Sequence, residues 1–334
     1  MRVAIIGGGF CGFECAKLLK KECFVTLFDS KEYFEYTPSI HKVLTSPGYL
    51  SSINRQFRDS LKGVQVLPEK VVSLSNAVVV SKKHKIPFDY AVICSGVGYP
   101  IFLKNAQDVY TVKSGKECLE CSSLLSQAGS VLVVGGGLIG VEVAAELAQK
   151  SNAKITLVHP FNRLIERNPE NASAYAKKWL LGHNVEIVFE ERVVDRTNDV
   201  FITDKGRKIR ADLVFWCAGI KPEPSFYKGT KDEKGYVSVN EFLQTSSYPN
   251  MFCGGDACSV REEKTAQNAL LHAKIIAKNI IRHSHGIALL SYKPSPKVMV
   301  ISLGDYAGIF VYRGFVLTGW IPALLKKLIE LRER

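Results

Sequence analysis

The stretch Met1-Arg-Val-Ala-Ile-Ile-Gly-Gly-Gly-Phe-Cys-Gly12 decides the fold of this chain. Residues 2–6 are predicted to form a buried strand, because four of the five are apolar. Glycines then follow at the spacing G-x-G-x-x-G, and a segment with helical periodicity begins at Phe13. The first glycine permits a tight turn, the second lets the backbone approach a pyrophosphate, and the third lets the helix pack closely on the strand. The helix N-terminus would supply free N–H groups to the phosphates, so the stretch predicts a dinucleotide-binding turn.

A second predicted strand, residues 24–28, ends at Asp29. An acidic side chain at this point can accept a hydrogen bond from a ribose hydroxyl. A lone G-x-G-x-x-G is a weak signal, whereas strand, glycines, helix, strand and acid in this order form a strong one.

The chain then repeats this pattern. Residues 130–140, Ser-Val-Leu-Val-Val-Gly-Gly-Gly-Leu-Ile-Gly, restate the opening, and a helical segment and a second strand at 154–158 follow. Each copy continues with a β-rich stretch and closes with a strand that ends in a glycine turn, at residues 89–96 and 212–219. The sequence therefore predicts two dinucleotide-binding units.

Composition sets limits on the class of protein. The 334 residues suffice for two domains, and the hydrophobic fraction of 46% is ordinary for a globular protein. The nine cysteines are scattered singly, which favours reduced thiols in an intracellular, reducing compartment. The net charge of +12 is not gathered in a tail, and no nucleic-acid-binding signature accompanies it, so no nucleic acid is expected as a partner. The apolar stretch at 314–325 is shorter than the ~20 residues of a membrane-spanning helix.

The last third carries one more landmark. A predicted strand ends in Gly254-Gly255-Asp256, which belongs by type at another phosphate or sugar contact, and a long helix is predicted from Lys264. Residues 292–320 alternate strand-like runs with glycine turns. Residues 321–334 form a predicted helix with apolar positions 321, 324, 325, 328 and 331 on one face.

Two glycine units, two closing glycine turns and a late Gly-Asp resemble the two-dinucleotide-binding-domain flavoproteins, the pyridine nucleotide-disulfide oxidoreductase superfamily, over nearly the whole chain. In that family the first unit binds FAD, the second binds NAD(P)H, and the Gly-Asp returns to the flavin. The resemblance implies an α/β fold with two Rossmann-like domains. FAD would be bound by residues 1–106 and 223–290, NAD(P)H by an inserted domain at 107–222, and residues 291–334 would form a small C-terminal α+β portion.

Finer features favour quinone reductases within the superfamily. Tyr-Phe-Glu-Tyr-Thr37-Pro38 resembles a flavin-contacting element of the type II NADH:quinone dehydrogenases. Thr265-Ala-Gln-Asn-Ala269 matches the start of their quinone-site element, although Leu271 replaces its final glutamine. The compact C-terminus and residues 264–273 are more similar to the apoptosis-inducing-factor-like NAD(P)H:ubiquinone oxidoreductases, the ferroptosis suppressor group.

The resemblance implies ping-pong chemistry, with hydride transfer from NAD(P)H to flavin N5 and then two-electron reduction of a quinone. Glu142 would face the nicotinamide, unless it is a solvated glutamate, and Lys264 would contact the flavin, unless it is an exposed lysine. The implied FAD contacts are Gly7, Gly9, Phe10, Gly12, Asp29, Ser30, Thr37, Pro38, Val71, Gly96, Gly255, Asp256, Thr265 and Ala266. The implied NAD(P)H contacts are Gly135, Gly137, Leu138, Ile139, Gly140, Glu142, His159 and Gly219. The implied quinone contacts are Gln267, Leu270, Tyr306 and Phe310, and no metal is expected.

The strand that ends at Val158 is followed by His159. An acidic residue at this position would repel the 2′-phosphate of NADPH, and histidine does not. Arg163 and Arg167 lie nearby and could offer cations, or could equally be solvated. We therefore expect both NADH and NADPH to serve. His272, on the long helix, is either a packed core histidine or a proton source for the acceptor pocket.

Cys118 and Cys121 lie where low-molecular-weight thioredoxin reductases carry their redox pair. The residues around them continue as a predicted helix, which favours structural cysteines and disfavours a disulfide reductase.

The terminal helix raises the question of membrane contact. Its apolar face and Trp320, with Lys326, Lys327, Arg332 and Arg334 beside it, suit an interfacial helix on an anionic membrane. It could instead pack on its own body or on the partner in a homodimer, and a monomer or homodimer is expected. The favoured function is a quinone reductase bound peripherally at the cytosolic face of a membrane. A reductase of a protein acceptor such as ferredoxin, rubredoxin or thioredoxin, and an apoptosis-inducing-factor-like signalling flavoprotein, remain alternatives.

Overall fold

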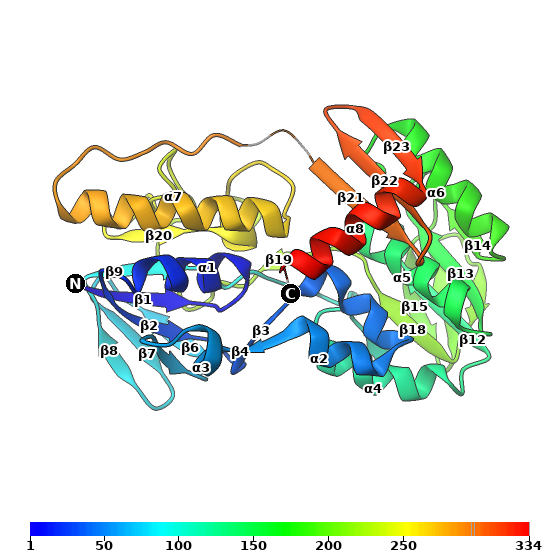
Figure 1. The fold of residues 1–334 in the computed structure, drawn as a ribbon. Helices are drawn as coiled ribbons and strands as arrows, with labels where there is room; N and C mark the ends of the chain where they lie inside the picture. The colour runs from blue at the N-terminus through cyan, green and yellow to red at the C-terminus, as the bar shows by residue number, and fades with distance from the viewer. Residues whose placement is uncertain (295, 297, 334) are drawn as a thin grey trace. The chain divides into compact units, whose positions relative to one another are not determined.

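The structure is a computed structural model that describes residues 1–294, 296 and 298–333. Its packing divides the chain into two units (Figure 1). Unit 1 comprises Met1–Glu35, Asn54–Gly98 and Ile220–Ser295, and unit 2 comprises Tyr36–Ile53, Tyr99–Gly219 and Pro296–Arg334. The packing assigns residues 36–53 and the C-terminal segment to unit 2, so the predicted domain boundaries remain predictions.

Unit 1 is built on a five-stranded parallel sheet in the order β20-β9-β1-β2-β5 (Figure 1). The strands predicted at 2–6 and 24–28 are confirmed as β1 and β2, and the predicted long helix is confirmed as α7. Helices α1 and α7 pack together, since the Cys15 thiol of α1 lies 3.7 Å from the Ala273 carbonyl oxygen of α7. The elements of unit 1 are β1 Arg2–Ile6, α1 Phe10–Leu19, β2 Phe24–Phe28, β3 Tyr33–Glu35, β4 Asn54–Gln56, α3 Phe57–Ser60, β5 Gln65–Leu67, β6 Val71–Leu74, β7 Val78–Ser81, β8 Lys85–Pro87, β9 Tyr90–Ile93, β10 Val97–Gly98, β19 Lys221–Pro222, β20 Met251–Cys253, the 3₁₀ turn η3 Gly255–Ala257 and α7 Ala266–Ser284.

Unit 2 repeats this architecture. Its parallel sheet has the order β11-β18-β12-β13-β14, so the strand that precedes each glycine turn, β1 or β12, is central in its sheet. The predicted internal repeat is thereby confirmed in three dimensions. The elements of unit 2 are η1 Thr37–Leu44, η2 Pro47–Tyr49, α2 Leu50–Ile53, β11 Val109–Tyr110, α4 Gly115–Leu125, β12 Ser130–Val134, α5 Leu138–Lys150, β13 Lys154–His159, α6 Glu170–Gly182, β14 Glu186–Phe189, β15 Val193–Thr197, β16 Val200–Thr203, β17 Lys208–Arg210, β18 Leu213–Trp216, β21 Val298–Leu303, β22 Ala307–Tyr312, β23 Phe315–Gly319 and α8 Trp320–Glu333.

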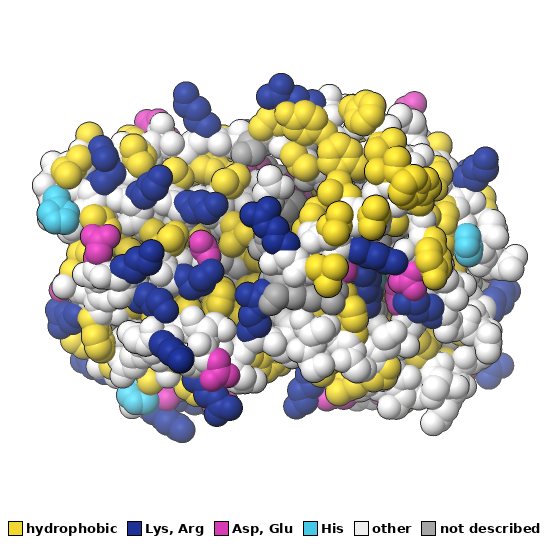
Figure 2. Space-filling model, in the orientation of Figure 1, with side chains coloured by type: hydrophobic (Ala, Val, Ile, Leu, Met, Phe, Trp, Pro, Cys, Tyr) yellow, Lys and Arg dark blue, Asp and Glu magenta, His cyan; other side chains and the backbone are white. Residues whose placement is uncertain are grey.

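The C-terminal part of unit 2 is an antiparallel sheet, β21-β22-β23, on which α8 packs. The predicted terminal helix is confirmed, but two of its charged residues are turned inward, while Lys327 and Arg332 stay exposed. Lys326 and Glu330 are 8% and 2% exposed, whereas Leu328 and Leu331 are 55% and 70% exposed. Figure 2 shows hydrophobic side chains gathered over α8 and this sheet. The expectation that Lys326 flanks a membrane-facing surface is wrong, and Arg334 lies outside the described residues.

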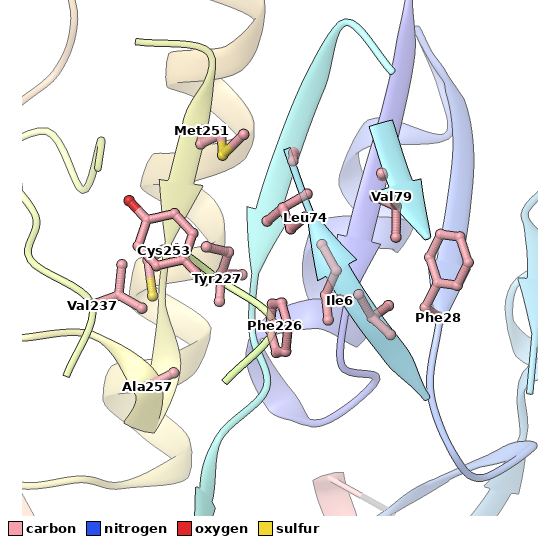
Figure 3. Close-up of a cluster of buried hydrophobic side chains, with 14 of the residues drawn as sticks. Ile6, Phe28, Leu74, Val79, Phe226, Tyr227, Val237, Met251, Cys253 and Ala257 are labelled. Atoms are coloured by element: carbon pink, nitrogen blue, oxygen red, sulfur yellow. The ribbon is translucent and has the colours of Figure 1, made fainter. Parts of the chain in front are cut away.

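The core of unit 1 lies between its parallel sheet and the antiparallel sheet β6-β7-β8 (Figure 3). Ile6 and Phe28 from the parallel sheet meet Leu74 and Val79 from the antiparallel one, and Tyr227 completes the cluster with no exposed surface. Unit 2 has the equivalent core against β15-β16-β17. In each unit the core packs against the parallel sheet, and the glycine turn follows the central strand of that sheet. Across the described residues, no helix has both the length and the apolar character that a membrane span needs.

Candidate functional site

The first glycine turn follows β1. Gly7 has φ +101°, and its N–H donates to the Phe28 carbonyl at 2.8 Å. A Cβ at Gly12 would lie 1.8 Å from the Gly7 carbonyl oxygen, so only glycine lets α1 pack this closely. The Gly8 N–H donates to Asp29 Oδ2 at 2.6 Å. The turn therefore has the three features that the spacing predicts, and the acid after β2 braces it.

The second glycine turn is built in the same way. Gly135 has φ +106°, and its N–H donates to the Val158 carbonyl at 2.8 Å. A Cβ at Gly140 would lie 1.7 Å from the Gly135 carbonyl oxygen. Here the N–H of Gly136 donates to Nδ1 of His159 at 2.9 Å. His159 thus takes the bracing position that Asp29 occupies in unit 1.

Both turns can receive a phosphate. Neither α1 nor α5 has a side-chain cap at its N-terminus or an acidic residue in its first turn, so their first N–H groups are left for a ligand. A Cβ at Gly9 or at Gly137 would meet nothing within 4 Å, which leaves room for close approach. The residues present therefore fit a dinucleotide at each turn.

Two polar groups of unit 1 also fit a ligand. The Ser95 hydroxyl, beside Gly96, is buried and has no hydrogen-bond partner among the described residues. Burial raises the pKa of Asp256, although Lys264 and His272 oppose the effect. A buried carboxylate is costly unless it is paired, and the hydroxyls of a ribityl chain or ribose would pair it.

The remaining predicted FAD contacts lie on several elements. Gly96 and Gly255 have positive φ, Thr265 caps α7 by accepting from the Asn268 N–H at 3.3 Å, and Ala266 begins that helix. Unit 1 holds them all except Thr37 and Pro38, which begin η1 in unit 2. Within unit 1, Phe10 lies on α1, Val71 is buried at the start of β6 and Ser30 is exposed after β2. These roles remain predictions.

Lys264 is held by its own loop. Its ammonium donates to the carbonyl oxygens of Cys258 at 2.7 Å and Val260 at 3.1 Å, and it lies over the Tyr236 ring. Lys264 is therefore not a solvated lysine. Because these contacts stabilise the loop before α7, we expect it to position the N-terminus of that helix.

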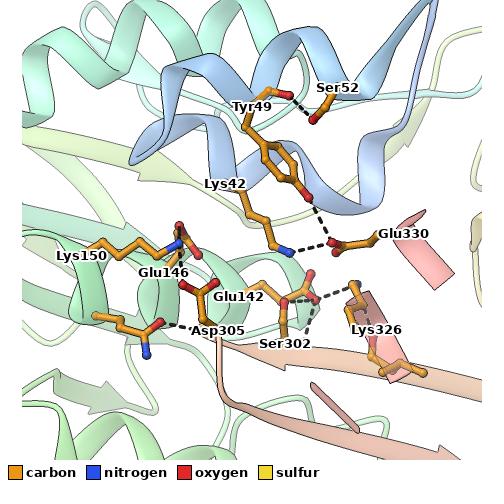
Figure 4. Close-up of polar contacts among 12 residues, drawn as sticks. Lys42, Tyr49, Ser52, Glu142, Glu146, Lys150, Ser302, Asp305, Lys326 and Glu330 are labelled. Atoms are coloured by element: carbon orange, nitrogen blue, oxygen red, sulfur yellow. Dashed lines mark hydrogen bonds and ion pairs between the residues drawn. The ribbon is translucent and has the colours of Figure 1, made fainter. Parts of the chain in front are cut away.

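Glu142 lies just beyond the first turn of α5, and its partners come from distant sequence (Figure 4). Its Oε1 accepts from the Ser302 N–H and hydroxyl, both at 3.0 Å, and from Lys326 Nζ at 3.1 Å. Burial alone would raise the pKa of Glu142, but Lys326 and His41 hold it below its usual range. Glu142 is thus a fixed carboxylate, ionised at neutral pH. The sequence did not identify Ser302 or Lys326 as its partners.

A second buried pair lies nearby in unit 2 (Figure 4). Lys42 of η1 lies 2.7 Å from Glu330 of α8, whose Oε2 also accepts from the Tyr49 hydroxyl at 3.0 Å. Both members of the pair are almost fully buried. Two ion pairs, through Lys326 and Glu330, therefore fix the inward face of α8.

The predicted quinone contacts belong to both units. Gln267 and Leu270 are on α7 in unit 1, whereas Tyr306 and Phe310 are on the β21–β22 hairpin in unit 2. Tyr306 is 75% exposed and its ring lies under Lys327. Their assignment to a quinone remains a prediction.

Cys118 and Cys121 are confirmed on a helix, α4, one turn apart. Both are buried and neither is in a disulfide, and burial raises the pKa of Cys121 to about 12. A redox dithiol needs an accessible thiolate, so this pair is unsuited to disulfide exchange.

The cations expected around a 2′-phosphate have partners in the protein. Arg163 donates to the carbonyl oxygens of Asn168 at 2.8 Å and Glu166 at 2.5 Å. His159 is 3% exposed, with Nε2 at 3.3 Å from the Glu166 carboxylate. Both side chains therefore brace the loop after β13, and NADPH use remains a prediction.

Affinity of unit 2 for NAD⁺ should stay level down to the ordinary histidine pKa of about 6.5 and fall only at lower pH, as the lowered pKa of His159 is passed. Burial lowers the pKa of His159, and Glu166 opposes this only in part. Nδ1 must be unprotonated to accept the Gly136 N–H, so the bracing contact is complete above the ordinary pKa and is lost on acidification. Calorimetric titration with NAD⁺ between pH 5.5 and 8 measures this. A His159→Asn variant, whose Oδ1 can replace Nδ1, should show a flatter profile, and identical profiles would refute the mechanism.

Comparison with known proteins agrees with this geometry. A sequence model of the family described as pyridine nucleotide-disulphide oxidoreductase matches residues 1–273. The chain is 28% identical to ferroptosis suppressor protein 1 of Taeniopygia guttata, with 100% of this chain and 93% of that protein covered. NDH2 from Plasmodium falciparum in complex with NADH superposes with a TM-score of 0.89 at 17% identity, over 99% of this chain and 94% of that one. The sulfide:quinone oxidoreductase of Aquifex aeolicus gives 0.87 at 17% identity, over 99% and 90%. These two likenesses concern the fold alone.

Proposed function

Since the chain belongs to the pyridine nucleotide-disulphide oxidoreductase family, we propose that it is an FAD-dependent NAD(P)H:quinone oxidoreductase. Family membership makes it an oxidoreductase, and the predicted cofactors, FAD and NAD(P)H, are those of the family. The single observation that carries the proposal is the pair of matched glycine turns. In each, a side chain accepts a backbone N–H of the turn, and space is left at the N-terminus of the following helix.

When bound, FAD supplies the redox chemistry, taking two electrons from NAD(P)H and passing them to the acceptor. The protein itself binds and orients the two cofactors. Gly9 and Gly137 would leave room for the two pyrophosphates, and the N-termini of α1 and α5 would supply N–H groups to them. Fixing both cofactors in one geometry supplies the entropic part of the rate enhancement.

We assign Glu142 the role of orienting the nicotinamide end of NAD(P)H. Ser302 and Lys326 fix its Oε1, and its low pKa keeps it anionic. A fixed carboxylate can accept a hydrogen bond from a carboxamide without reorganising. Lys326 would act through Glu142 as a positioning residue.

A quinone is the proposed acceptor for two reasons. Quinones are apolar and partition into lipid, and α8 with β21–β23 presents an exposed apolar surface within this chain. The similarity of Thr265-Ala-Gln-Asn-Ala269 to the start of the quinone-site element of the type II NADH:quinone dehydrogenases points the same way. The buried cysteine pair argues against a disulfide as the acceptor.

Turnover with a panel of acceptors tests the proposal. NADH or NADPH oxidation should accelerate with short-chain ubiquinones and should not respond to ferredoxin, rubredoxin or oxidised thioredoxin. A Cys118→Ser/Cys121→Ser variant should keep the quinone activity. Turnover with a protein acceptor alone would overturn the quinone assignment, and absence of turnover with every acceptor would favour a signalling flavoprotein.

Peripheral membrane contact through α8 gives a separate prediction. Replacing Leu324, Leu328 and Leu331 with glutamine should lower the partition onto anionic liposomes by more than about tenfold, since each leucine contributes roughly 1.5–3 kcal/mol when buried. The inward ion pairs are left intact by this change. Flotation measures the partition, with Leu119→Gln/Leu124→Gln/Leu181→Gln, three other exposed leucines of unit 2, as the matched control. Equal flotation of both triple variants would remove the proposed membrane contact.

A further inference from the structure

A buried histidine stands directly behind the turn that carries Asp256. His272 of α7 is 1% exposed, and its Nδ1 accepts the Gly255 N–H at 3.0 Å. Its Nε2 lies 2.8 Å from Glu262 Oε1, and the other oxygen of Glu262 accepts from the Tyr292 hydroxyl at 2.8 Å. These contacts connect Tyr292, Glu262, His272 and Gly255, and all four residues belong to unit 1.

The contacts determine which nitrogen carries the proton. Burial disfavours the imidazolium, while Cys258 and Glu262 favour it and raise the pKa of His272. However, the Cys258 thiol donates to the Gly255 carbonyl at 3.2 Å, so it carries its own proton and adds no negative charge. The Gly255 N–H points at Nδ1, which leaves no place for a hydrogen there. The ring is therefore neutral and carries its proton on Nε2, the nitrogen that lies close to Glu262.

The turn needs such a brace because its backbone is unusual. Gly255 adopts φ +67°, in the left-handed region, and its buried N–H donates to the His272 ring. Gly254 is enclosed, since a Cβ there would lie 2.6 Å from the Cys11 thiol and 3.1 Å from His272 Cβ. The turn thus rests on His272 and α1, and it carries Asp256, whose buried carboxylate a ligand hydroxyl can pair.

We propose that His272, oriented by Glu262 and Tyr292, is a positioning residue that fixes the Gly254–Asp256 turn for FAD. This rests on FAD as the cofactor of unit 1. FAD retention then depends on a hydrogen-bond acceptor at the Nδ1 position. The same arrangement recurs in unit 2, where His159 accepts the Gly136 N–H and faces Glu166. In each unit one turn is thus braced by a histidine whose Nδ1 accepts a backbone N–H and whose Nε2 lies close to a glutamate.

Two polar variants separate positioning from packing. In His272→Asn the side-chain Oδ1 can replace Nδ1 as the acceptor, whereas in His272→Gln the amide reaches toward the Nε2 position and the Gly255 N–H loses its partner. Apo-protein is titrated with FAD, and quenching of flavin fluorescence gives Kd. We expect His272→Asn to stay within about threefold of wild type and His272→Gln to bind FAD about tenfold more weakly, the loss expected for one buried hydrogen bond.

The melting temperature of each apo-protein serves as the control for folding. The proposal is overturned if the two variants have equal Kd for FAD, because an acceptor at the Nδ1 position would then make no difference. If His272→Gln does not fold, Glu262→Gln, which removes the orienting charge, is expected to raise Kd about threefold or more, and an unchanged Kd overturns the proposal. Because FAD binding is measured without an acceptor, these results are independent of whether a quinone is the substrate.

Discussion

A Gly137→Ala variant should bind NAD(P)H at least tenfold more weakly than wild type while folding normally and retaining its FAD. Gly137 caps α5 with φ −73°, a backbone that alanine adopts without strain, and a Cβ there would meet no protein atom within 4 Å. The added methyl group would therefore meet only the pyrophosphate. A tenfold loss corresponds to about 1.4 kcal/mol, a modest cost for one displaced phosphate contact.

Flavin reduction by NADH and NADPH in rapid mixing measures the effect, with the flavin spectrum reporting FAD content. Gly182→Ala, at the end of α6 and equally open, is the matched control and should behave as wild type. Gly140→Ala should differ from both, since its Cβ would lie 1.7 Å from a backbone oxygen and must destabilise the turn. Wild-type saturation by NADH in the Gly137→Ala variant would mean that the second turn does not hold the nucleotide.

A Lys42→Met variant should lower the melting temperature by about 10 °C. The change removes the cation that lies 2.7 Å from the Glu330 carboxylate, where both side chains are almost fully buried. Breaking one side of a buried ion pair costs about 3–5 kcal/mol, and each kcal/mol shifts the midpoint by about 2–4 °C in a domain of this size. Thermal unfolding measures the shift, and hydrogen exchange should place the loosened amides in α8.

The double variant Lys42→Met/Glu330→Met is the decisive partner of this experiment. Replacing both charges with apolar side chains of similar length removes the uncompensated carboxylate, so most of the lost stability should return. If the double variant is as unstable as the single one, packing and not charge compensation holds α8 in place.

The locally encoded parts of the fold were predictable. The strands around both glycine turns, the long helix α7 and the terminal helix all lie where the sequence pattern indicates. Their signals are short-range, since a strand needs alternating or continuous burial and a turn needs a glycine at positive φ. Family membership agrees with the resemblance that the two motifs carried.

The candidate site was predictable only where one segment forms it. The partners of Glu142 come from residues 160 and 184 positions away, and no local pattern marks Ser302 or Lys326 as facing a carboxylate. His159 was expected at the nucleotide, and the tertiary structure adds that its Nδ1 accepts the Gly136 N–H, a contact that no local pattern marks.

By itself, then, the sequence determined the two twinned parallel sheets and their phosphate turns, because glycine spacing and strand burial act over a few residues. Only the tertiary structure decided which face of α8 is exposed. Periodicity identifies an apolar face but cannot say whether it is covered, and here buried partners turn Lys326 and Glu330 inward while leucines of the apolar face stay exposed. That choice depends on desolvated charges finding opposite charges far along the chain, which is a property of the folded molecule.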